Sequence, residues 1–507
     1  MKLNQTFIEE RNQVQAEDGI KYPAKCMADM TQAPAFDRAK NHMLQHIRTI
    51  NEAHLIMLKE QNILSESDAV AIMQALESLD YEKYRFSTYT GKVEDIYFEM
   101  ESELIERTHG VAGNLHLGRS RNDMCLTWVH MMIRDHLLKT IELMIRVRNT
   151  LYLLGEEHKN TLYVIHTHTQ HAQPGMIGIY FLAAGDMLGR DIDRLKNAYA
   201  HVNSSPMGAA AITTTGFPIS RQRVAELSGF DSVIENSYDA ISNMDLFTDT
   251  GAALSHCALD LSRIIADLVL WATEEEDMIR LADGYISISS IMPQKRNPIA
   301  LEHLRSALSV TKGFADSMSL AFFKSPYGDI VDHDGAEDAL LSTFEKLQEC
   351  LTLFNNVIAT MEINRPLLYE RAFESFSVVT EIADEMFRAY NIPFREAHHF
   401  VSYMVRKALS VHFNLKNITP EFFSECFEEV FHRPFTFDFE PILKAINPER
   451  FVASREVYGG TGPKAMQAMI ESARTKIKDN AAWLETAQAR IAQSDARRAE
   501  AIQEMLA

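Results

Sequence analysis

The chain has 507 residues, 46% of them apolar and 24% charged, with a formal net charge of −20. Its length exceeds what one hydrophobic core usually supports, so two to four domains are expected, and its composition excludes a disordered chain. The negative charge argues against nucleic acid and anionic membrane as general partners.

The sequence also gives no sign of a membrane span or an export signal. No apolar run reaches 18 residues, and the N-terminus lacks a basic stretch followed by an apolar one. The five cysteines are an odd number, lie far apart and form no CxxC pair, so neither a disulfide framework nor a zinc site is indicated. We therefore expect a cytoplasmic protein without membrane partners.

Residues 1–115 are expected to form an N-terminal helical domain. Within it, residues 62–68 combine turn formers with N-cap residues, which predicts a helix that begins at about Asp68. No proline interrupts the chain between Pro34 and Pro174. That gap favours long, unbroken helices.

The middle of the chain, residues 116–364, is expected to form a bundle of long helices. Apolar residues recur at spacings of three and four, first from Val129 to Leu151 and again from Leu254 to Leu268. This pattern and the proline-free gaps predict five helices, over residues 124–155, 175–202, 252–272, 299–323 and 336–361. The fold class is therefore all-α, built on a long central five-helix bundle.

Several of these helices carry apolar residues on more than one face, which is typical of helices that are buried all round. A single five-helix bundle would leave part of that surface exposed, so the pattern favours assembly of bundles into an oligomer. The alternative is a monomer whose terminal domains cover the helices.

Residues 365–507 are expected to form a C-terminal helical domain that is richer in aromatic residues and prolines. Its last part, residues 471–507, is highly charged and rich in alanine. That composition predicts a long helix surrounded by solvent.

The first chemically informative motif is His116-Leu-Gly-Arg-Ser-Arg-Asn-Asp123, which lies just before the first long helix. Arginine suits bidentate binding of a carboxylate, and a helix N-terminus adds partial positive charge and free N–H groups. The sequence therefore suggests an anion-binding site. The alternative is a helix N-cap with a solvated cluster of charges.

The second motif, Thr167-His-Thr-Gln-His-Ala-Gln-Pro174, offers two histidines three residues apart. Metal binding is conceivable, but no acidic partner lies at ligand spacing and glutamine is a poor ligand. A histidine that acts as an acid or as an oriented hydrogen-bond donor fits better. The alternative is a histidine with a purely structural role.

The third motif is Ser289-Ser-Ile-Met-Pro-Gln-Lys-Arg-Asn-Pro298, which follows a flexible approach from Gly284 to Ile288. A segment this polar, with two prolines, cannot be a core strand or the middle of a helix. We expect a loop that presents a serine beside a fixed positive charge. The alternative is an ordinary Ser/Pro loop.

Together the three motifs resemble those of argininosuccinate lyase, a family of the fumarase/aspartase superfamily, which are similar to HxGRSRND, THxQxAQP and GSSxMPQKxNP. Further similar segments lie at residues 236–240, 270–275, 393–398 and 459–463. The resemblance covers roughly residues 40–470. It implies three mostly helical domains and a homotetramer with a twenty-helix core, in which each active site is shared by three subunits.

The resemblance also implies the reaction and its residues. Fumarate would be eliminated from an N-succinyl compound across a C–N bond, with Ser290 as the base that removes the proton from carbon. Lys295 would supply the nearby positive charge, and His168, supported by Glu302, would act on the leaving nitrogen or orient a carboxylate. The substrate would be held by Ser120, Arg121, Asn122, Thr167, Gln170, Ser289, Met292, Asn297 and Tyr327.

Several positions depart from the family pattern. Ile299 stands where an aspartate usually follows the signature, and the segment 242–245 lacks an arginine. Residues 327–332 poorly match the segment that holds the far end of the substrate, because its glutamine and lysine are missing. The groups that would act on the succinyl part are kept, so the identity of the amine, arginine or another, stays open.

Two other readings of the function remain. One is a non-catalytic scaffold comparable to the lens crystallins of this fold, against which the presence of all four catalytic candidates argues. The other is a different branch of the superfamily, such as adenylosuccinate lyase, aspartase or fumarase. The chain has no P-loop and no GxGxxG after a strand, so no cofactor, nucleotide or metal is expected.

Overall fold

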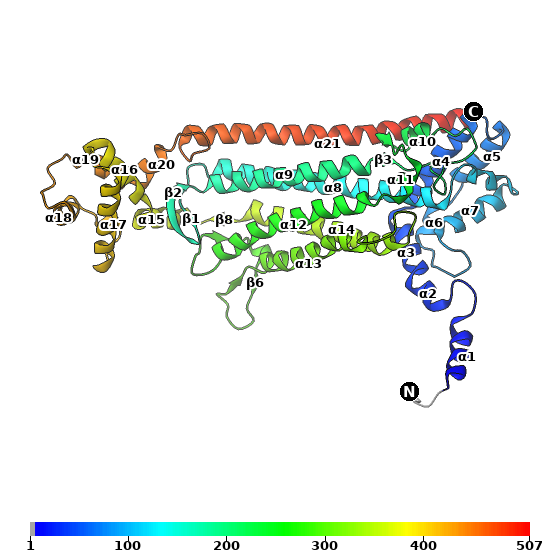
Figure 1. The fold of residues 1–507 in the computed structure, drawn as a ribbon, viewed down its shortest axis with the longest axis horizontal. Coiled ribbons are helices and arrows are strands. Elements are labelled where there is room, and N and C mark those ends of the chain that lie inside the picture. The colour runs from blue at the N-terminus through cyan, green and yellow to red at the C-terminus, as the bar shows by residue number, and fades with distance from the viewer. Residues whose placement is uncertain (1–5) are drawn as a thin grey trace.

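Five long helices lie side by side through the middle of the molecule (Figure 1). They are α8 (Arg121–Glu157), α9 (Gly178–Val202), α12 (Asp245–Trp271), α13 (Ile299–Ala321) and α14 (Asp332–Thr360). The computed structural model, which describes residues 6–507, thus confirms the all-α class and the central five-helix bundle. The predicted ranges differ from the observed ones by seven residues at most, at the start of α12.

Helix α8 shows why these boundaries arise. Ser120 caps its N-terminus in a reciprocal capping box with Asp123, which satisfies backbone N–H groups that have no partner within the helix. The next 37 residues contain no proline, and glycine appears only at Gly155, in the last turn. The helix therefore spans the whole length of the bundle.

The N-terminal region packs at one end of the bundle, and its first two helices project from it (Figure 1). The predicted N-cap is confirmed, because the Ser65 side chain accepts a hydrogen bond from the Asp68 N–H, so the helix begins two residues earlier than expected. The elements are α1 (Phe7–Asp18), α2 (Lys25–Met30), α3 (Gln32–His42), α4 (Leu44–Glu60), α5 (Glu66–Glu77), α6 (Tyr81–Arg85), α7 (Ile96–Arg107) and the 3-10 helix η1 (Val111–His116).

A smaller helical unit lies at the opposite end of the bundle (Figure 1). Its core is aromatic, with Phe400, Phe423 and Phe427 fully buried, and Leu162 and Val164 of the central domain pack into it. Its elements are α15 (Arg365–Glu374), η3 (Phe376–Val378), α16 (Val379–Tyr390), α17 (Phe394–Ser410), η4 (Leu415–Asn417), α18 (Pro420–Phe431), α19 (Glu440–Ala445) and α20 (Pro448–Ala453).

The last helix, α21 (Pro463–Leu506), leaves this unit and runs back along the bundle to the N-terminal region (Figure 1). The predicted helix over residues 471–507 is confirmed, but it is not surrounded by solvent, because one face of α21 is buried against the bundle. Asn480 there accepts a hydrogen bond from Arg148 (2.7 Å), and Arg498 pairs with Glu52 (2.9 Å). The predicted C-terminal range 365–507 therefore contains two parts that pack in different places.

The described residues form only short strands, in four two-stranded sheets. The longest pairs β1 (Leu162–Thr167) with β2 (Gln170–Met176) in an antiparallel hairpin. The others pair β3 (Ser204–Ser205) with β4 (Ser232–Val233), β5 (Ile279–Arg280) with β8 (Glu362–Ile363), and β6 (Ser287–Ile288) with β7 (Arg296–Asn297). The remaining helices are α10 (Arg221–Leu227), α11 (Ser237–Ser242) and η2 (Asp283–Tyr285). Across residues 6–507, none of the helices has the length and apolar character needed to cross a bilayer.

Candidate active site

The signature segment forms the tip of the hairpin β6–β7, which projects from the bundle just before α13 (Figure 1). Ser289 organises this tip, because its hydroxyl accepts hydrogen bonds from the N–H groups of Ile291 (3.3 Å) and Met292 (3.1 Å). The neighbouring Ser290 is exposed, and its side chain makes no hydrogen bond within residues 6–507. The loop therefore presents Ser290 outward while Ser289 fixes the turn.

Several predicted site residues line a cavity of about 720 Å³ at the base of this hairpin. They are Met292, Lys295, Asn297 and Glu302. The Asn297 amide donates to the Ser287 hydroxyl across the hairpin (3.3 Å), and Glu302 lies in the first turn of α13. The structure thus brings a lysine, an amide and a carboxylate together near the exposed serine.

The second motif forms the turn of the hairpin β1–β2, at the bundle end that faces the C-terminal unit. Thr167 pairs with Gln170, and the two central residues, His168 and Thr169, both have positive φ, +52° and +59°. Such a turn matches the twist of the flanking strands, and histidine adopts positive φ more readily than most residues, whereas the β-branched Thr169 is strained there. His168 is therefore held at an exposed tip beside a strained residue.

The first motif, His116–Asp123, lies at the other end of the bundle, where α8 begins. Asp123 is fully buried and accepts three backbone hydrogen bonds, from Ser120 (2.8 Å), Gly208 (2.8 Å) and Ala210 (2.9 Å). It thereby fixes the helix start to the loop after β3. Asn122 contacts the same loop, since its amide donates to the carbonyl of Ala211 (3.1 Å).

Arg121 is enclosed on several sides. Its guanidinium forms an ion pair with Asp95 and lies 4.7 Å from the ring of Trp128, 5.1 Å from Tyr97 and 5.4 Å from Phe98. Its Nη1 is buried and has no partner among the described residues. One donor of the group therefore remains for a ligand. Sequence reasoning missed Asp95 as its partner.

Tyr327 is held by the segment 236–240. Its hydroxyl donates to Asp239 (2.8 Å), a bond that raises the pKa of the tyrosine, and its carbonyl accepts from the hydroxyl of Tyr238 (2.7 Å). The two rings lie 5.4 Å apart. Two segments that the sequence singled out separately thus form one structural unit.

The three motifs lie at separate places in one chain: the hairpin β6–β7, the hairpin β1–β2 and the start of α8 (Figure 1). Tyr327 belongs to the same bundle end as the start of α8, because α14 begins there. A single chain therefore brings the predicted residues together in groups, but not into one complete site. Ser290, His168, Lys295 and Glu302 are all exposed in it.

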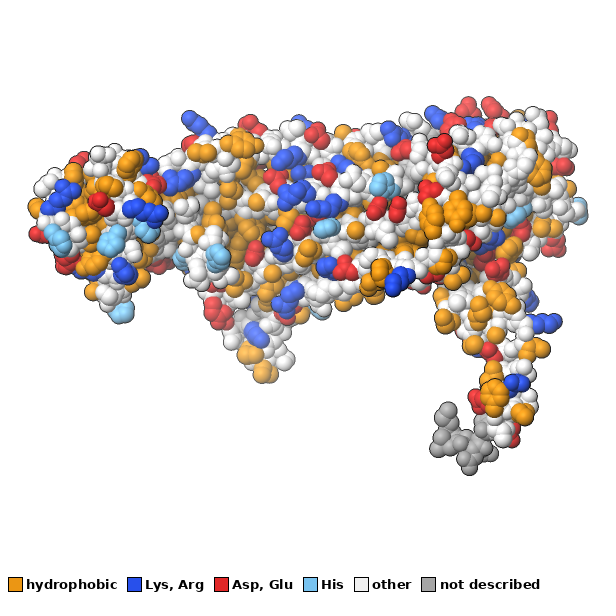
Figure 2. Space-filling view, viewed as in Figure 1, with side chains coloured by type: hydrophobic (Ala, Val, Ile, Leu, Met, Phe, Trp, Pro, Cys, Tyr) orange, Lys and Arg blue, Asp and Glu red, His pale blue; other side chains and the backbone are white. Residues whose placement is uncertain are grey.

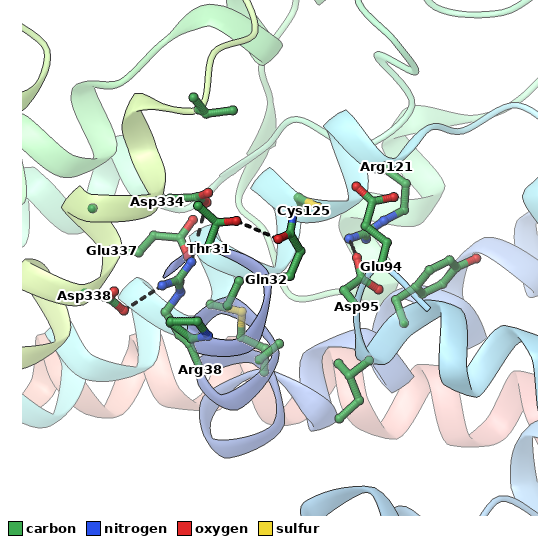
Figure 3. Close-up of a pocket in the computed structure, with 18 of the residues that line it drawn as sticks. Thr31, Gln32, Arg38, Glu94, Asp95, Arg121, Cys125, Asp334, Glu337 and Asp338 are labelled. Carbon is green, nitrogen blue, oxygen red and sulfur yellow. Dashed lines mark hydrogen bonds and ion pairs between the residues drawn. The ribbon is translucent and has the colours of Figure 1, made fainter. Parts of the chain in front are cut away.

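A second cavity, of about 570 Å³, lies beside Arg121 at the N-terminal end of the bundle (Figure 3). Its walls come from α2, α3, the segment before α7, the start of α8 and the first turns of α14. On one side Arg38 binds Glu337 (2.7 Å) and Asp338 (2.6 Å). No sequence signal predicts this cluster, because its members lie about 300 residues apart.

The same cluster contains the described residues best placed to bind a metal. Ligand atoms of His333, Asp334 and Glu337 all lie within 4.8 Å of one another. However, Arg38 already places its Nε 2.7 Å from Glu337 and its Nη2 3.5 Å from Asp334. A metal ion would have to displace a buried guanidinium, so this group fits an internal ion-pair network better.

Comparison with known families gives two matches. Residues 38–313 match a family model described as lyase, and residues 376–453 match one described as argininosuccinate lyase C-terminal. The first match covers most of the N-terminal region and the bundle as far as α13, but not α14, and the second covers most of the small C-terminal unit.

Individual proteins resemble the chain over most of its length. It is 36% identical to argininosuccinate lyase 2 of Agrobacterium fabrum, over 91% of this chain and 92% of the relative. It is 37% identical to argininosuccinate lyase of Methanococcoides burtonii, over 86% and 88%. Among solved structures, an EDDS lyase variant with bound fumarate has a TM-score of 0.83 at 28% identity, covering 94% of this chain and 95% of that one. A fumarate lyase from Mesorhizobium sp. BNC1, at 17% identity and a TM-score of 0.70 over 87% and 98%, shares the fold.

Proposed function

Because the chain belongs to the argininosuccinate lyase family, we propose that it is a carbon–nitrogen lyase that releases fumarate from an N-(1,2-dicarboxyethyl) amine or amino acid. The observation that carries the proposal is the signature hairpin, which presents Ser290 next to a cavity lined by Lys295, Asn297 and Glu302. Argininosuccinate, which would give arginine and fumarate, is the first substrate to test.

In the proposed mechanism Ser290, as its alkoxide, removes the proton from the carbon next to a carboxylate. The C–H electron pair forms the double bond of fumarate, and the C–N pair leaves with the nitrogen. The intermediate carries extra negative charge on that carboxylate, so fixed positive charge nearby should supply the largest stabilisation. Lys295 suits this role, and its charge also favours ionisation of the serine.

His168 acts on the side of the leaving nitrogen, either as its proton donor or as the group that orients a carboxylate. Glu302 is its proposed partner, since a carboxylate on one ring nitrogen fixes the tautomer and stabilises the imidazolium. Closure of the segment from Gly284 to Ile288 over bound substrate would exclude water. The proposed substrate contacts are Ser120, Arg121, Asn122, Thr167, Gln170, Ser289, Met292, Asn297 and Tyr327.

We also propose a homotetramer in which three chains contribute to each site. The proposal is supported by the exposure of every catalytic candidate in one chain and by the separation of the motifs. Apolar patches lie among charged groups on the face of the bundle turned to the viewer (Figure 2). On α13 the exposed apolar residues include Val310, Phe314 and Leu320, at 51%, 41% and 73% exposure. Burial of this surface against other chains would favour assembly.

The domain division at residues 115 and 364 remains our proposal, with α21 assigned to the bundle that it covers rather than to the small C-terminal unit. The cytoplasm remains the proposed compartment, since all five cysteines are free.

The function is tested by following fumarate formation through its ultraviolet absorbance with argininosuccinate as substrate. Wild type should turn over, and Ser290→Ala should lose activity by at least about a thousandfold. Ser319→Ala, an exposed serine on α13, is the matched control and should behave as wild type.

If argininosuccinate is inert, the reverse reaction is run with fumarate and a panel of amines, and a Ser290-dependent product then identifies the amine. Binding of fumarate without turnover in either direction would refute the proposed lyase function and support a non-catalytic scaffold.

A further inference from the structure

The cavity beside Arg121 has more negative than positive charge in its walls (Figure 3). Its two cationic side chains are Arg38 and Arg121. Its five carboxylates belong to Glu94, Asp95, Asp334, Glu337 and Asp338. The formal excess is therefore three negative charges, in a cavity whose 570 Å³ suits a small ligand.

On one side the guanidinium of Arg38 is shared by three carboxylates, and His333 contacts two of them, Glu337 at 3.1 Å and Asp334 at 3.6 Å. Arg38, whose side chain is 7% exposed, contacts Glu337 at 2.7 Å, Asp338 at 2.6 Å and Asp334 at 3.5 Å. The buried Arg38 and Glu337 satisfy each other, while the side chains of Asp334 and Asp338 are about half exposed, at 47% and 58%. Those two carboxylates therefore remain accessible to a cation in the cavity.

On the opposite side, Arg121 offers a donor. Its Nη1 is buried and without a partner among the described residues, although the rest of the guanidinium is held by Asp95 and three rings. Arg121 lies between Ser120 and Asn122, the residues proposed to bind the succinyl group. This wall thus suits an anionic or carbonyl group of the ligand.

Between these two sides the cavity has both polar side chains, Thr31 and Gln32, and apolar or aromatic ones (Figure 3). The apolar and aromatic side chains include Tyr22, Met27, Met30 and Trp128. Thioether and aromatic surfaces accommodate an alkyl chain, and aromatic faces also attract cations. The cavity therefore fits an N-succinyl amine whose succinyl carboxylate lies near Arg121 and whose amine part has an aliphatic stem and a positive charge at its far end.

We propose that this cavity is the subsite for the amine product, and that Asp334 and Asp338 select an amine whose far end is a cation with no carboxylate beside it. Diamines and guanidinoalkylamines have this chemistry. An α-amino acid such as arginine would bring its own carboxylate close to Asp334, Glu337 and Asp338, and like charges repel at short range. This inference rests on the proposed lyase function.

The test measures the reverse reaction, with fumarate and pairs of amines that differ only in one carboxylate: agmatine against arginine, and putrescine against ornithine. We expect the amines without the carboxylate to have at least a tenfold higher kcat/KM. Asp334→Asn and Asp338→Asn should each raise the KM for agmatine about tenfold and leave kcat within about twofold of wild type. The ratio of kcat/KM for agmatine to kcat/KM for arginine should fall accordingly.

Glu345→Gln serves as the control, and Glu94→Gln tests another carboxylate of the cavity. Glu345→Gln removes an exposed negative charge from the same helix outside the cavity and should change nothing. Glu94→Gln removes an exposed carboxylate that lines the cavity but makes no ion pair within residues 6–507, so its folding should be unaffected while its KM for agmatine rises. Thermal unfolding and oligomer mass of each variant are compared with wild type.

The outcomes separate the two proposals. If arginine is used as well as agmatine, or if the KM for agmatine is unchanged in the aspartate variants, the amine subsite is refuted while the lyase function stands. If no amine gives a Ser290-dependent product, the lyase function is refuted and this inference falls with it.

Discussion

The turn that presents His168 should become more stable when Thr169 is replaced by glycine. Thr169 is β-branched and has a φ of +59°, a conformation that costs a non-glycine residue roughly 1–2 kcal/mol. Glycine removes this penalty, but because it loses more conformational freedom on folding it destabilises the turn by about 0.5–1 kcal/mol. The expected net gain in the local free energy of opening is therefore about 0.5–1 kcal/mol.

Hydrogen exchange of the hairpin Leu162–Met176, followed by mass spectrometry, measures this gain directly. Thr169→Gly and Thr169→Val both lose the hydroxyl that donates to the His168 carbonyl (2.6 Å), and only valine keeps the branched carbon. Exchange should therefore be about two- to fivefold slower in the glycine variant than in the valine variant, the factor that corresponds to 0.5–1 kcal/mol. Faster exchange in the glycine variant than in the valine variant would refute the reasoning.

Three further changes have definite expected results. Glu52→Gln leaves Arg498 and Arg48 without their buried counter-charge, so it should lower the free energy of unfolding by about 3–5 kcal/mol in a urea titration. Glu60→Gln, in an exposed pair with Arg223, should lower it by under about 1 kcal/mol, and equal urea midpoints of the two variants would contradict this. Asp95→Asn keeps the N-cap of α7 but removes the charge that positions Arg121. The KM for fumarate in the reverse reaction should therefore rise about tenfold with little change in Tm, and an unchanged KM would show that the aromatic rings alone hold Arg121. Burial raises the pKa of Asp191 to about 7, above its unfolded value of about 3.9, so ionisation of Asp191 opposes folding progressively between pH 4 and 7 and fully above pH 7. Asp191→Asn should therefore raise Tm at pH 8 and leave it unchanged at pH 4, and an equal change in Tm at both pH values would contradict this reasoning.

The bundle could be predicted from the sequence because its signal is local. Apolar residues at spacings of three and four define each long helix within its own range, and prolines mark the gaps between them. The docking of α21 could not, because its buried residues, such as Asn480, Leu484 and Arg498, are few and partly polar within a highly charged stretch. Local composition thus predicts the helix but not the surface that it covers.

The candidate site divides in the same way. The motifs supplied Ser290, His168 and Lys295 because each lies within a short recognisable segment. The ion pairs of Arg121 with Asp95 and of Arg38 with Glu337 join residues far apart in the chain, so no local pattern encodes them. In the proposed homotetramer the three motifs would meet across surfaces between chains, and the sequence indicates those surfaces only as apolar residues on more than one helix face.

The position of α21 has a consequence for the order in which the protein can form. Arg498 is synthesised 446 residues after its partner Glu52, so the nascent N-terminal region waits for almost the whole chain before this buried carboxylate gains that partner. Until then the grooves of α8 and α9 that α21 covers stay open to solvent, and contacts this distant in sequence form slowly. Docking of α21 is therefore a late step of folding, and a chain whose synthesis stops before the 44 residues of this helix would leave the surface of α8 and α9 that it covers exposed to solvent.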